Sequence, residues 1–289
     1  MTAPSRSGTT RLLRTRSELR EALATIPRPL GLVPTMGWLH DGHRSLMQQA
    51  RAENATTIAT IFVNPRQFNI AADYQRYPRN EARDLAICEQ ESIDFVFAPA
   101  VDEVFPPGFD TVVSVGAIAG PLEGAARPGH FDGVATVVAI LFNLVGAERA
   151  YFGQKDAQQV MVIRQMARDL AIPTRVIACP TVREPDGLAL SSRNVHLSPD
   201  ERGAAPVLHR ALLAARRRWE AGERSAAALR ESMEETLAHE PLANPEYVSV
   251  ADGRTLAELE RVEGTALLSL AVRFGSTRLI DNELLEPPD

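Results

Sequence analysis

Lysine, cysteine and long apolar runs are scarce in this sequence of 289 residues. No apolar stretch approaches the ~20 residues that a membrane-spanning helix needs, which argues against a membrane protein. Residues 1–10 are polar and lack the apolar segment of a secretory signal, so we expect a frayed tail and a cytoplasmic protein. The formal net charge of -6 argues against a dedicated nucleic-acid-binding protein.

The two cysteines, Cys88 and Cys179, lie in apolar stretches without the spacing of metal ligands. We expect buried, reduced thiols, as in a cytoplasmic protein. A hydrophobic content of 45% and a charged content of 24% are typical of a soluble globular protein. The length allows one large domain or two ordinary ones.

Lysine occurs once, as Lys155, whereas the other 30 of the 31 basic residues are arginine. A general preference for arginine explains the thirty and leaves the exception open. Lysine carries a compact ammonium on a flexible stem, and arginine carries a broad planar fork. Lysine therefore occurs at position 155 either by chance or because the position needs the smaller head group.

The segment Pro34–His43 has the most informative pattern in the chain. It follows the apolar run Pro29–Val33 and precedes a stretch of helical periodicity, which predicts a strand, a loop and a helix. His40 and His43 stand where the helix begins, and the unpaired N–H groups of a helix N-terminus favour anions. The imidazoles add donors, and the two glycines of the segment allow close approach of a ligand. The pattern suits a nucleotide phosphate, although a lone His-x-x-His pair is more often inert.

Apolar patterns predict alternating helices and strands up to about residue 182. Predicted strands are Pro29–Val33, Thr56–Val63, Asp94–Phe97, Thr111–Val115, Ala150–Phe152 and Thr174–Ala178. Predicted helices are 16–24, 40–54, 80–91, 134–145 and a segment ending near 170. Predicted loops are Asp73–Pro78, Val101–Gly108 and Leu122–Gly133, the last a mobile loop that can close over a site. We therefore expect residues 1–182 to form a Rossmann-like doubly wound parallel sheet with right-handed crossovers.

The composition shifts from Pro199 onward to Ala/Arg/Glu-rich stretches. These predict two long helices at about 200–221 and 225–239. Strand-like segments follow at Tyr247–Val250, Thr265–Val272 and Arg278–Asp281. Residues 183–289 are therefore expected to form a smaller C-terminal α+β domain.

Several polar residues follow predicted strands, where open α/β sheets bind their ligands. Gln67 and Phe68 follow the strand Thr56–Val63, although their surroundings also fit a plain turn. Lys155 follows the strand Ala150–Phe152 at a junction with a helix, and Gln159 lies one turn later.

Two further segments carry polar groups, and each fits two interpretations. Ser191-Ser192-Arg193 follows the polar linker Thr181–Gly187, and its hydroxyls and guanidinium suit a polyphosphate. A helix-capping loop is the alternative. Arg127 and His130, in the predicted mobile loop, are either site residues or solvated loop residues.

Taken together, these segments resemble the pantoate–β-alanine ligase (pantothenate synthetase) family of the nucleotidyltransferase superfamily with a His-x-Gly-His phosphate loop. The resemblance runs over nearly the whole chain, from about residue 12 to residue 285. It is carried by Pro34-Thr35-Met36-Gly37 with His40-Asp41-Gly42-His43, Phe62-Val63-Asn64-Pro65 with Gln67-Phe68, Arg127-Pro128-Gly129-His130-Phe131, Phe152-Gly153 with Lys155-Asp156 and Gln158-Gln159, and Asp186-Gly187-Leu188-Ala189 with Ser191-Ser192-Arg193-Asn194. Trp38 departs from the family's usual small residue, and Asp41 from its usual glutamate.

The resemblance implies an ATP-dependent condensation of (R)-pantoate with β-alanine to pantothenate, AMP and pyrophosphate, through pantoyl adenylate. It also implies Mg²⁺ and a homodimer. The implied catalytic residues are His40, His43, Lys155, Ser191, Ser192 and Arg193. ATP binding is implied for these residues and for Pro34, Thr35, Met36, Gly37, Gly153, Asp156, Val182 and Leu190. Pantoate binding is implied for Met36, Gln67, Phe68, Gln159, Arg127 and His130, and a place near Mg²⁺ for Asp84.

Two other functions remain open from the sequence. A nucleotidyltransferase that joins AMP or CMP to a phosphorylated acceptor would share the His-x-Gly-His loop, but it would need cations for the acceptor phosphate where this chain has Gln67 and Gln159. A catalytically silent nucleotide-binding module is disfavoured because every polar catalytic residue expected from the resemblance is present.

Overall fold

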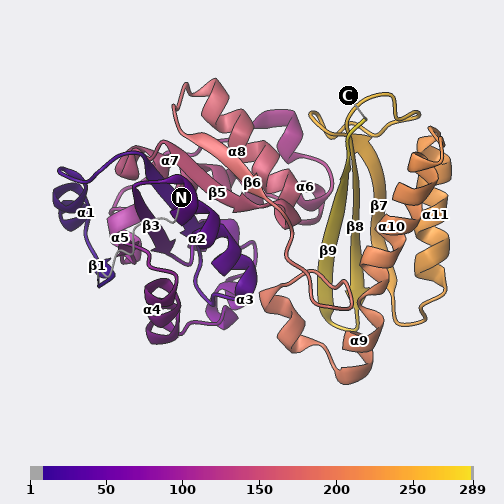
Figure 1. Cartoon of the computed structure of the whole chain (residues 1–289), viewed down its shortest axis with the longest axis horizontal. Helices are drawn as coiled ribbons and strands as arrows, with labels where there is room; N and C mark the ends of the chain where they lie inside the picture. The colour runs from indigo at the N-terminus through magenta and orange to yellow at the C-terminus, as the bar shows by residue number, and fades with distance from the viewer. Residues whose placement is uncertain (1–8, 288–289) are drawn as a thin grey trace. The chain divides into compact units, whose positions relative to one another are not determined.

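The computed structural model describes residues 9–287, so most of the tail expected over residues 1–10 lies outside the described residues. The chain divides into two compact units (Figure 1). The first comprises the chain up to Gly153 together with Gln158–Cys179, and the second comprises Gln154–Ala157 with the chain from Pro180 onward. Lys155 therefore belongs to the second unit, although a strand and a helix of the first unit flank it in sequence.

The first unit is built on a six-stranded sheet with the order β1-β4-β3-β2-β5-β6 and parallel pairing throughout. Its strands are β1 (Arg11–Leu13), β2 (Leu30–Thr35), β3 (Thr56–Ile61), β4 (Phe95–Phe97), β5 (Arg149–Gly153) and β6 (Arg175–Cys179). From β2 the chain passes outward to β3 and β4 and then returns to β5 on the other side of β2. The order of strands therefore reverses between β2 and β5, where doubly wound sheets form a crevice. The predicted parallel sheet is confirmed.

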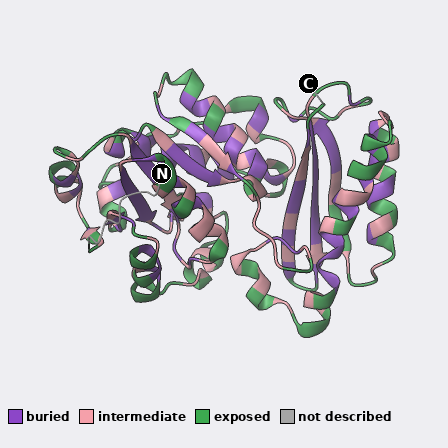
Figure 2. Cartoon of the chain, in the orientation of Figure 1, coloured by how far each residue is buried: buried purple, intermediate pink, exposed green. Residues whose placement is uncertain are grey.

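Helices connect these strands, and the central strands of the sheet are largely buried (Figure 2). The helices are α1 (Arg16–Leu23), α2 (Asp41–Glu53), α3 (Ala71–Arg76), α4 (Glu81–Gln90), α5 (Val101–Val104), α6 (Glu123–Ala126), α7 (His130–Val145) and α8 (Ala157–Asp169), with the 3-10 turns η1 (Pro65–Gln67), η2 (Gly116–Ala119) and η3 (Gln154–Asp156). As predicted from its apolar sequence, α7 is buried along most of its length. None of the described helices is long and apolar enough to cross a membrane.

The second unit is a three-stranded antiparallel sheet, β7-β8-β9, packed against helices. Its elements are η4 (Ser192–His196), α9 (Pro199–Ala204), α10 (Val207–Glu220), α11 (Ala226–Ala238), β7 (Asn244–Asp252), β8 (Ala266–Phe274) and β9 (Thr277–Leu285). Leu208 and Leu212 of α10 share a core with Leu229 of α11 and Leu270 of β8. The expected C-terminal α+β arrangement is confirmed.

Several local predictions are wrong. Thr111–Val115 is irregular, because it pairs with none of the described strands and exposes Val112. Most of the predicted loop Asp73–Pro78 is helix α3, and none of its described residues is buried, so no apolar periodicity marks it. The predicted loop Val101–Gly108 begins with one turn of helix, α5. Strand β1 is too short for its pattern to stand out.

The predicted loop Leu122–Gly133 is helical at both ends, where it forms α6 and the start of α7. Glu123 and His130 are buried there, so this segment is packed into the first unit. The predicted helix 200–221 is two helices, α9 and α10, separated at Ala205–Pro206. Proline lacks the backbone N–H that would continue the helix.

Candidate active site

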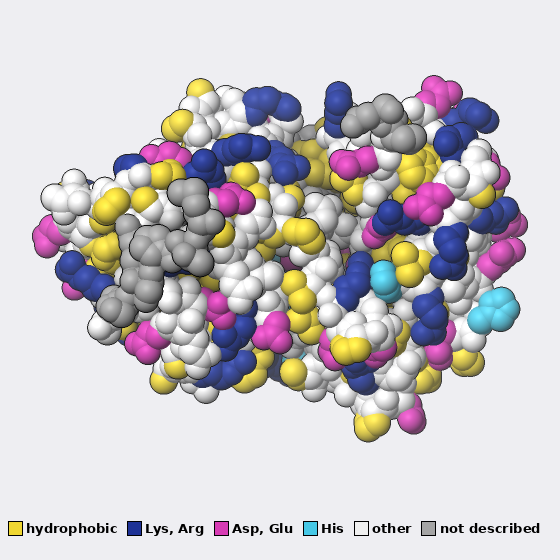
Figure 3. Space-filling model, in the orientation of Figure 1, with side chains coloured by type: hydrophobic (Ala, Val, Ile, Leu, Met, Phe, Trp, Pro, Cys, Tyr) yellow, Lys and Arg dark blue, Asp and Glu magenta, His cyan; other side chains and the backbone are white. Residues whose placement is uncertain are grey.

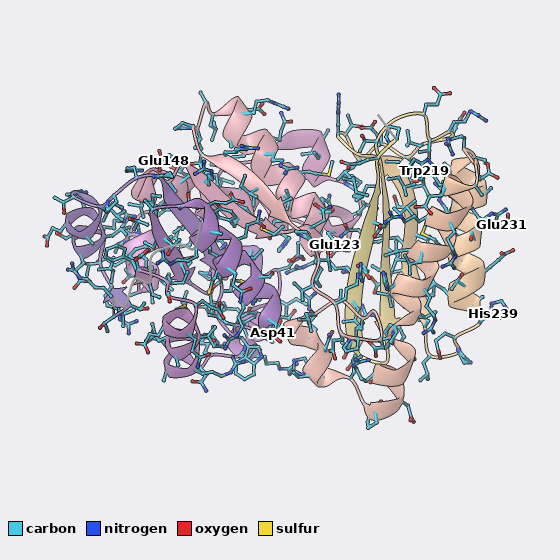
Figure 4. The ribbon with its side chains drawn as sticks, in the orientation of Figure 1. Asp41, Glu123, Glu148, Trp219, Glu231 and His239 are labelled. Atoms are coloured by element: carbon cyan, nitrogen blue, oxygen red, sulfur yellow. The ribbon has the colours of Figure 1, made fainter. Side chains whose placement is uncertain are left out.

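The loop after β2 places two imidazoles at the first turn of α2, which Asp41 begins (Figure 4). The His40 ring accepts a hydrogen bond from Gly42 N–H through Nδ1 at 3.1 Å, and the His43 ring accepts one from His40 N–H through Nδ1 at 3.3 Å. The ring centroids are 4.1 Å apart. Each imidazole thus caps the helix while lying against the other.

These two bonds decide which ring nitrogen carries the proton. Because Nδ1 is the acceptor in both rings, the neutral form of each carries its hydrogen on Nε2. The pair therefore offers two Nε2–H donors at the positive end of a helix dipole, an arrangement suited to an anion. Gly42 is required between them, since a Cβ there would lie 2.8 Å from Cε1 of His40.

Asp84 of α4 is buried and holds the turn that leads into His40. Its Oδ2 accepts from Trp38 N–H at 2.7 Å, and its Oδ1 accepts from Leu39 N–H at 2.9 Å. Trp38 has a φ of 53°, a region that bulky residues avoid, and Arg83 lies 5.2 Å from the centre of its ring. The carboxylate therefore fixes a strained backbone beside the imidazoles. Burial raises the pKa of the Cys88 thiol, one turn further along α4, to about 12, and the Asp84 charge adds to the rise.

Gln67, at the end of η1, is buried with its side chain oriented by two neighbours. Asn64, which is 1% exposed, donates through Nδ2 to Gln67 Oε1 at 3.1 Å and to the Gly133 carbonyl at 3.0 Å. Gln67 Nε2 lies 3.0 Å from Met36 Sδ. The Asn64 amide thus sets which end of the Gln67 carboxamide faces Met36.

Arg127 and His130 both hold the backbone of the same residue. His130 Nδ1 lies 2.8 Å from the Gln67 carbonyl oxygen, and Arg127 Nη2 donates to it at 3.3 Å. The ring of Phe68, the next residue, packs edge-on against Tyr74 at 5.7 Å. In the first unit the structure therefore brings Arg127 and His130 to Gln67, and Gln67 to Met36.

In the second unit, Lys155 lies on η3 with its side chain 17% exposed. Its Nζ is 3.8 Å from Asp156 Oδ1. Lys155 lines a small cavity with Ser191, Asn194 and Asp281, among other residues. The oxygen Oδ1 of Asn194 is buried there and has no hydrogen-bond partner among residues 9–287.

Ser191 is the N-cap of η4, where its Oγ accepts from Arg193 N–H at 3.2 Å. The capping loop that the sequence left open is therefore present, and the Ser191 hydroxyl proton remains to be donated elsewhere. Arg193 is exposed, and Ser192 is half-buried. The structure thus brings Lys155 and Ser191 to one cavity of the second unit.

The remaining predicted residues lie at strand ends, on α8 or in the segment after β6. Pro34 and Thr35 end β2, and Gly153 ends β5. Gln159 is half-buried on α8. The Val182 carbonyl accepts from Leu190 N–H at 2.9 Å.

Sequence patterns do not single out three residues, of which two bond to predicted site residues and one bonds to residues 118–123. They are Asn64, Gln158 and Asn282, all polar side chains that are nine-tenths buried. Burial of a carboxamide demands hydrogen-bond partners, but the sequence alone does not show which segments supply them. For Asn64, its place in an Asn-Pro turn after a strand is the sequence feature that could have indicated a structural role.

The described residues contain no cluster of three or more His, Cys, Asp or Glu side chains that could hold a metal ion. On the face visible in Figure 3, basic and acidic side chains are interspersed. The fold and the His-x-Gly-His turn define the class: an α/β fold of the nucleotidyltransferase type, with this turn between a parallel strand and a helix.

Comparison with known proteins narrows this class to a family. The chain matches the pantoate–β-alanine ligase family over residues 11–284. It is 61% identical over 276 residues to the pantothenate synthetase of Roseiflexus castenholzii, which covers 96% of this chain and 99% of that protein. The chain belongs to the pantoate–β-alanine ligase family, as its resemblance predicted.

Solved structures agree with this assignment. The crystal structure of pantothenate synthetase from Thermus thermophilus superposes with a TM-score of 0.91 at 49% identity, over 96% of this chain and all of that one. The pantoate–β-alanine ligase of Francisella tularensis, complexed with β,γ-ATP and β-alanine, has a TM-score of 0.77 at 33% identity, over 95% of this chain and 97% of that one.

Proposed function

We propose that this chain carries out the reaction of its family, the ATP-dependent joining of pantoate to β-alanine. The pantoate carboxylate attacks the α-phosphorus of ATP, which gives pantoyl adenylate and pyrophosphate. The amine of β-alanine then attacks the activated acyl carbon, which gives pantothenate and AMP. The observation that carries the proposal is the His40–His43 pair, because two Nε2–H donors at a helix N-terminus suit the growing charge on the α-phosphate.

Pantoate is assigned to the Gln67 side of the first unit. The oriented amide of Gln67, with Gln159, would bind the hydroxyl and carboxylate, and Met36 with Phe68 would contact the gem-dimethyl group. The bond from Asn64 to Gln67 supports this assignment, since a fixed carboxamide distinguishes donor from acceptor. Arg127 and His130 would act here chiefly by holding the Gln67 backbone.

The polyphosphate of ATP is assigned to the second unit. Lys155 would hold it as a movable point charge, and Ser191, Ser192 and Arg193 would bind the β- and γ-phosphates until pyrophosphate leaves. The shared cavity of Lys155 and Ser191 supports this grouping. Gly153 and Asp156 would contact the ribose, and Val182 and Leu190 would contact the adenine. In the His-x-Gly-His turn and the strand before it, Pro34, Thr35 and Gly37 would also contact ATP. On this assignment the C-terminal unit is a lid that carries the phosphate-binding groups.

Magnesium enters as part of the MgATP substrate, which keeps most of its ligands as water and phosphate. Asp84 was predicted near the metal, but its two oxygens accept Trp38 and Leu39 N–H groups, which supports a positioning role. The homodimer and the cytoplasmic location stay predictions.

The test is an assay of the purified chain with MgATP and pantoate, with and without β-alanine. We expect pyrophosphate release that depends on pantoate, and pantothenate only when the amine is present. Nucleotide transfer to a phosphorylated acceptor, with no amide product, would favour the alternative nucleotidyltransferase function.

Lys155→Ala is expected to lower the rate of adenylate formation by about 10²–10³ or more while the fold is kept, because it removes a preorganised charge. Pyrophosphate exchange into ATP measures this half-reaction, and the melting temperature checks the fold. Lys155→Arg keeps the charge but not the compact head group, so it should recover only part of the loss. Exchange within a few-fold of the parent in Lys155→Ala would contradict the assigned role.

A further inference from the structure

Asn282 of β9 directs its whole carboxamide at the turn that carries Lys155. Its Nδ2 donates to the Gln154 carbonyl at 3.0 Å and to the Lys155 carbonyl at 2.8 Å. Its Oδ1 accepts from Gln154 Nε2 at 3.3 Å. Asn282 is 6% exposed, so these bonds form where water cannot replace them.

Asn282 is itself held by a buried ion pair. Its N–H donates to Asp281 Oδ1 at 2.9 Å, and Arg183 binds the Asp281 carboxylate through both nitrogens of its fork at 2.6 and 3.0 Å. Arg183 also donates to the Gly187 carbonyl at 3.1 Å and forms a β-bridge with Ala189. This network joins β9, the turn at Lys155 and the strand-like segment that leads to Ser191.

The network fixes the two polyphosphate-binding groups on one body. Gln154–Ala157 belongs to the second unit although it lies between β5 and α8 in sequence. Lys155 and Ser191 line the same cavity, and Asp281 is part of its wall. The position of the lysine relative to the serine is therefore set within the second unit, through β9.

We propose that Asn282 is a positioning residue for Lys155: it ties the lysine-bearing turn to β9, so that Lys155 and Ser191–Arg193 hold the polyphosphate as one preorganised group. The proposal rests on the function assigned to Lys155 above. Misplacement of a reacting or binding group by about 1 Å can cost about 10²-fold in rate, so loss of these bonds should reach the chemistry.

Asn282→Leu, which keeps the number and branching of the side-chain heavy atoms and removes all three bonds, is the test. Pyrophosphate exchange is measured for the parent, Asn282→Leu, Lys155→Ala and the double variant. We expect Asn282→Leu to lower the exchange rate by about 10–100-fold in the parent and by less than about 3-fold in the Lys155→Ala background, because a residue that acts through Lys155 has nothing to position once the ammonium is gone.

The matched control is Ser269→Ala. Ser269 lies opposite Asn282 on β8, is 5% exposed, and its Oγ has no hydrogen-bond partner within the described residues. Its exchange rate should match the parent. Asn282→Asp is the second variant, in case leucine prevents folding. It keeps the acceptor for Gln154 but sets a carboxylate against the two carbonyls, so it should show the same loss and the same dependence on Lys155.

The outcomes separate the two proposals. Equal fold-losses from Asn282→Leu or Asn282→Asp in both backgrounds, or a loss that parallels a fall in melting temperature, would overturn the positioning role. Near-parental exchange in Lys155→Ala alone would overturn the function assigned to the lysine. A loss confined to the background that contains Lys155 supports the inference.

Discussion

Among single side chains, Asp84 shows how a buried charge can act on a site without touching the substrate. It accepts the N–H groups of Trp38 and Leu39, next to His40, and Trp38 has a backbone conformation unusual for a large residue. In Asp84→Asn one of these N–H groups would face an amide NH₂. We expect the free energy of unfolding to fall by about 1–3 kcal/mol, since a buried donor is left unpaired. Urea unfolding measures this change.

The rate of adenylate formation in Asp84→Asn should also fall, by about tenfold or more, because the imidazoles lose part of their preorganisation. The matched control is Asp41→Asn, which also removes a carboxylate near His40 but at a side chain that is 79% exposed. Its stability and rate should stay near those of the parent. If Asp84→Asn kept the parental rate of pyrophosphate exchange, Asp84 would contribute to folding stability and not to catalysis.

Among the secondary-structure elements, the sequence predicts those with strong periodicity and misses those held by tertiary contacts. The β-branched run of β3 and the apolar length of α7 were sufficient to predict both elements. The short helix α6 lies within a segment predicted to be a loop, because Glu123-Gly124 has no helical signal of its own. Its support is remote in sequence: Gln158 of α8 accepts from Glu123 N–H at 3.0 Å and donates to the carbonyls of Ile118 and Pro121 at 3.0 and 2.8 Å.

Gln158→Leu should therefore destabilise the first unit. It removes the side-chain partner of the Glu123 N–H and of the Ile118 carbonyl, which costs about 1–3 kcal/mol for each group that water cannot reach, whereas the Pro121 carbonyl keeps its bond from Gly124 N–H at 2.9 Å. The change is measured by urea unfolding and by hydrogen exchange of residues 118–126. Gln165→Leu on the same helix is the control, since its half-buried side chain bonds to Arg168 and Asp169 of α8 itself. A stability equal to that of this control would show that Gln158 does not hold the segment.

For the chain as a whole, the candidate site could be predicted as a set of residues but not as an arrangement. The strand-to-helix junctions that carry His40 and Lys155 follow from apolar patterns and turn residues. The membership of Lys155 in the compact unit of β9 does not follow from these patterns, because the bonds between Asn282 and the Lys155 turn span 127 and 128 residues. Hydrogen bonds between residues so far apart in sequence depend on the whole fold, so local sequence patterns do not predict them.

A histidine of the second unit adds to the pH dependence of the chain's stability. His209 of α10 has a lowered pKa, because burial disfavours the charged imidazole and the Arg183 charge adds to the effect. The unfolded chain takes up this proton near pH 6.5, whereas the folded chain does so only at lower pH. The stabilisation is therefore complete above about pH 6.5 and is lost as the pH falls toward the folded pKa. The lowered carboxyl pKa values of Glu81 and Glu246 act in the same direction, but only below about pH 4.5.

We expect His209→Asn to flatten the fall in unfolding free energy between pH 6.5 and 5, a fall that one proton limits to about 1.4 kcal/mol per pH unit. Urea unfolding followed by circular dichroism at half-unit steps of pH measures the slope. His239→Asn, at the exposed end of α11 (Figure 4), is the control and should keep the parental slope. If His209→Asn kept that slope as well, the proton would have to be taken up elsewhere in the chain. A slope lost in both variants would show that the effect does not depend on the burial of His209 beside Arg183.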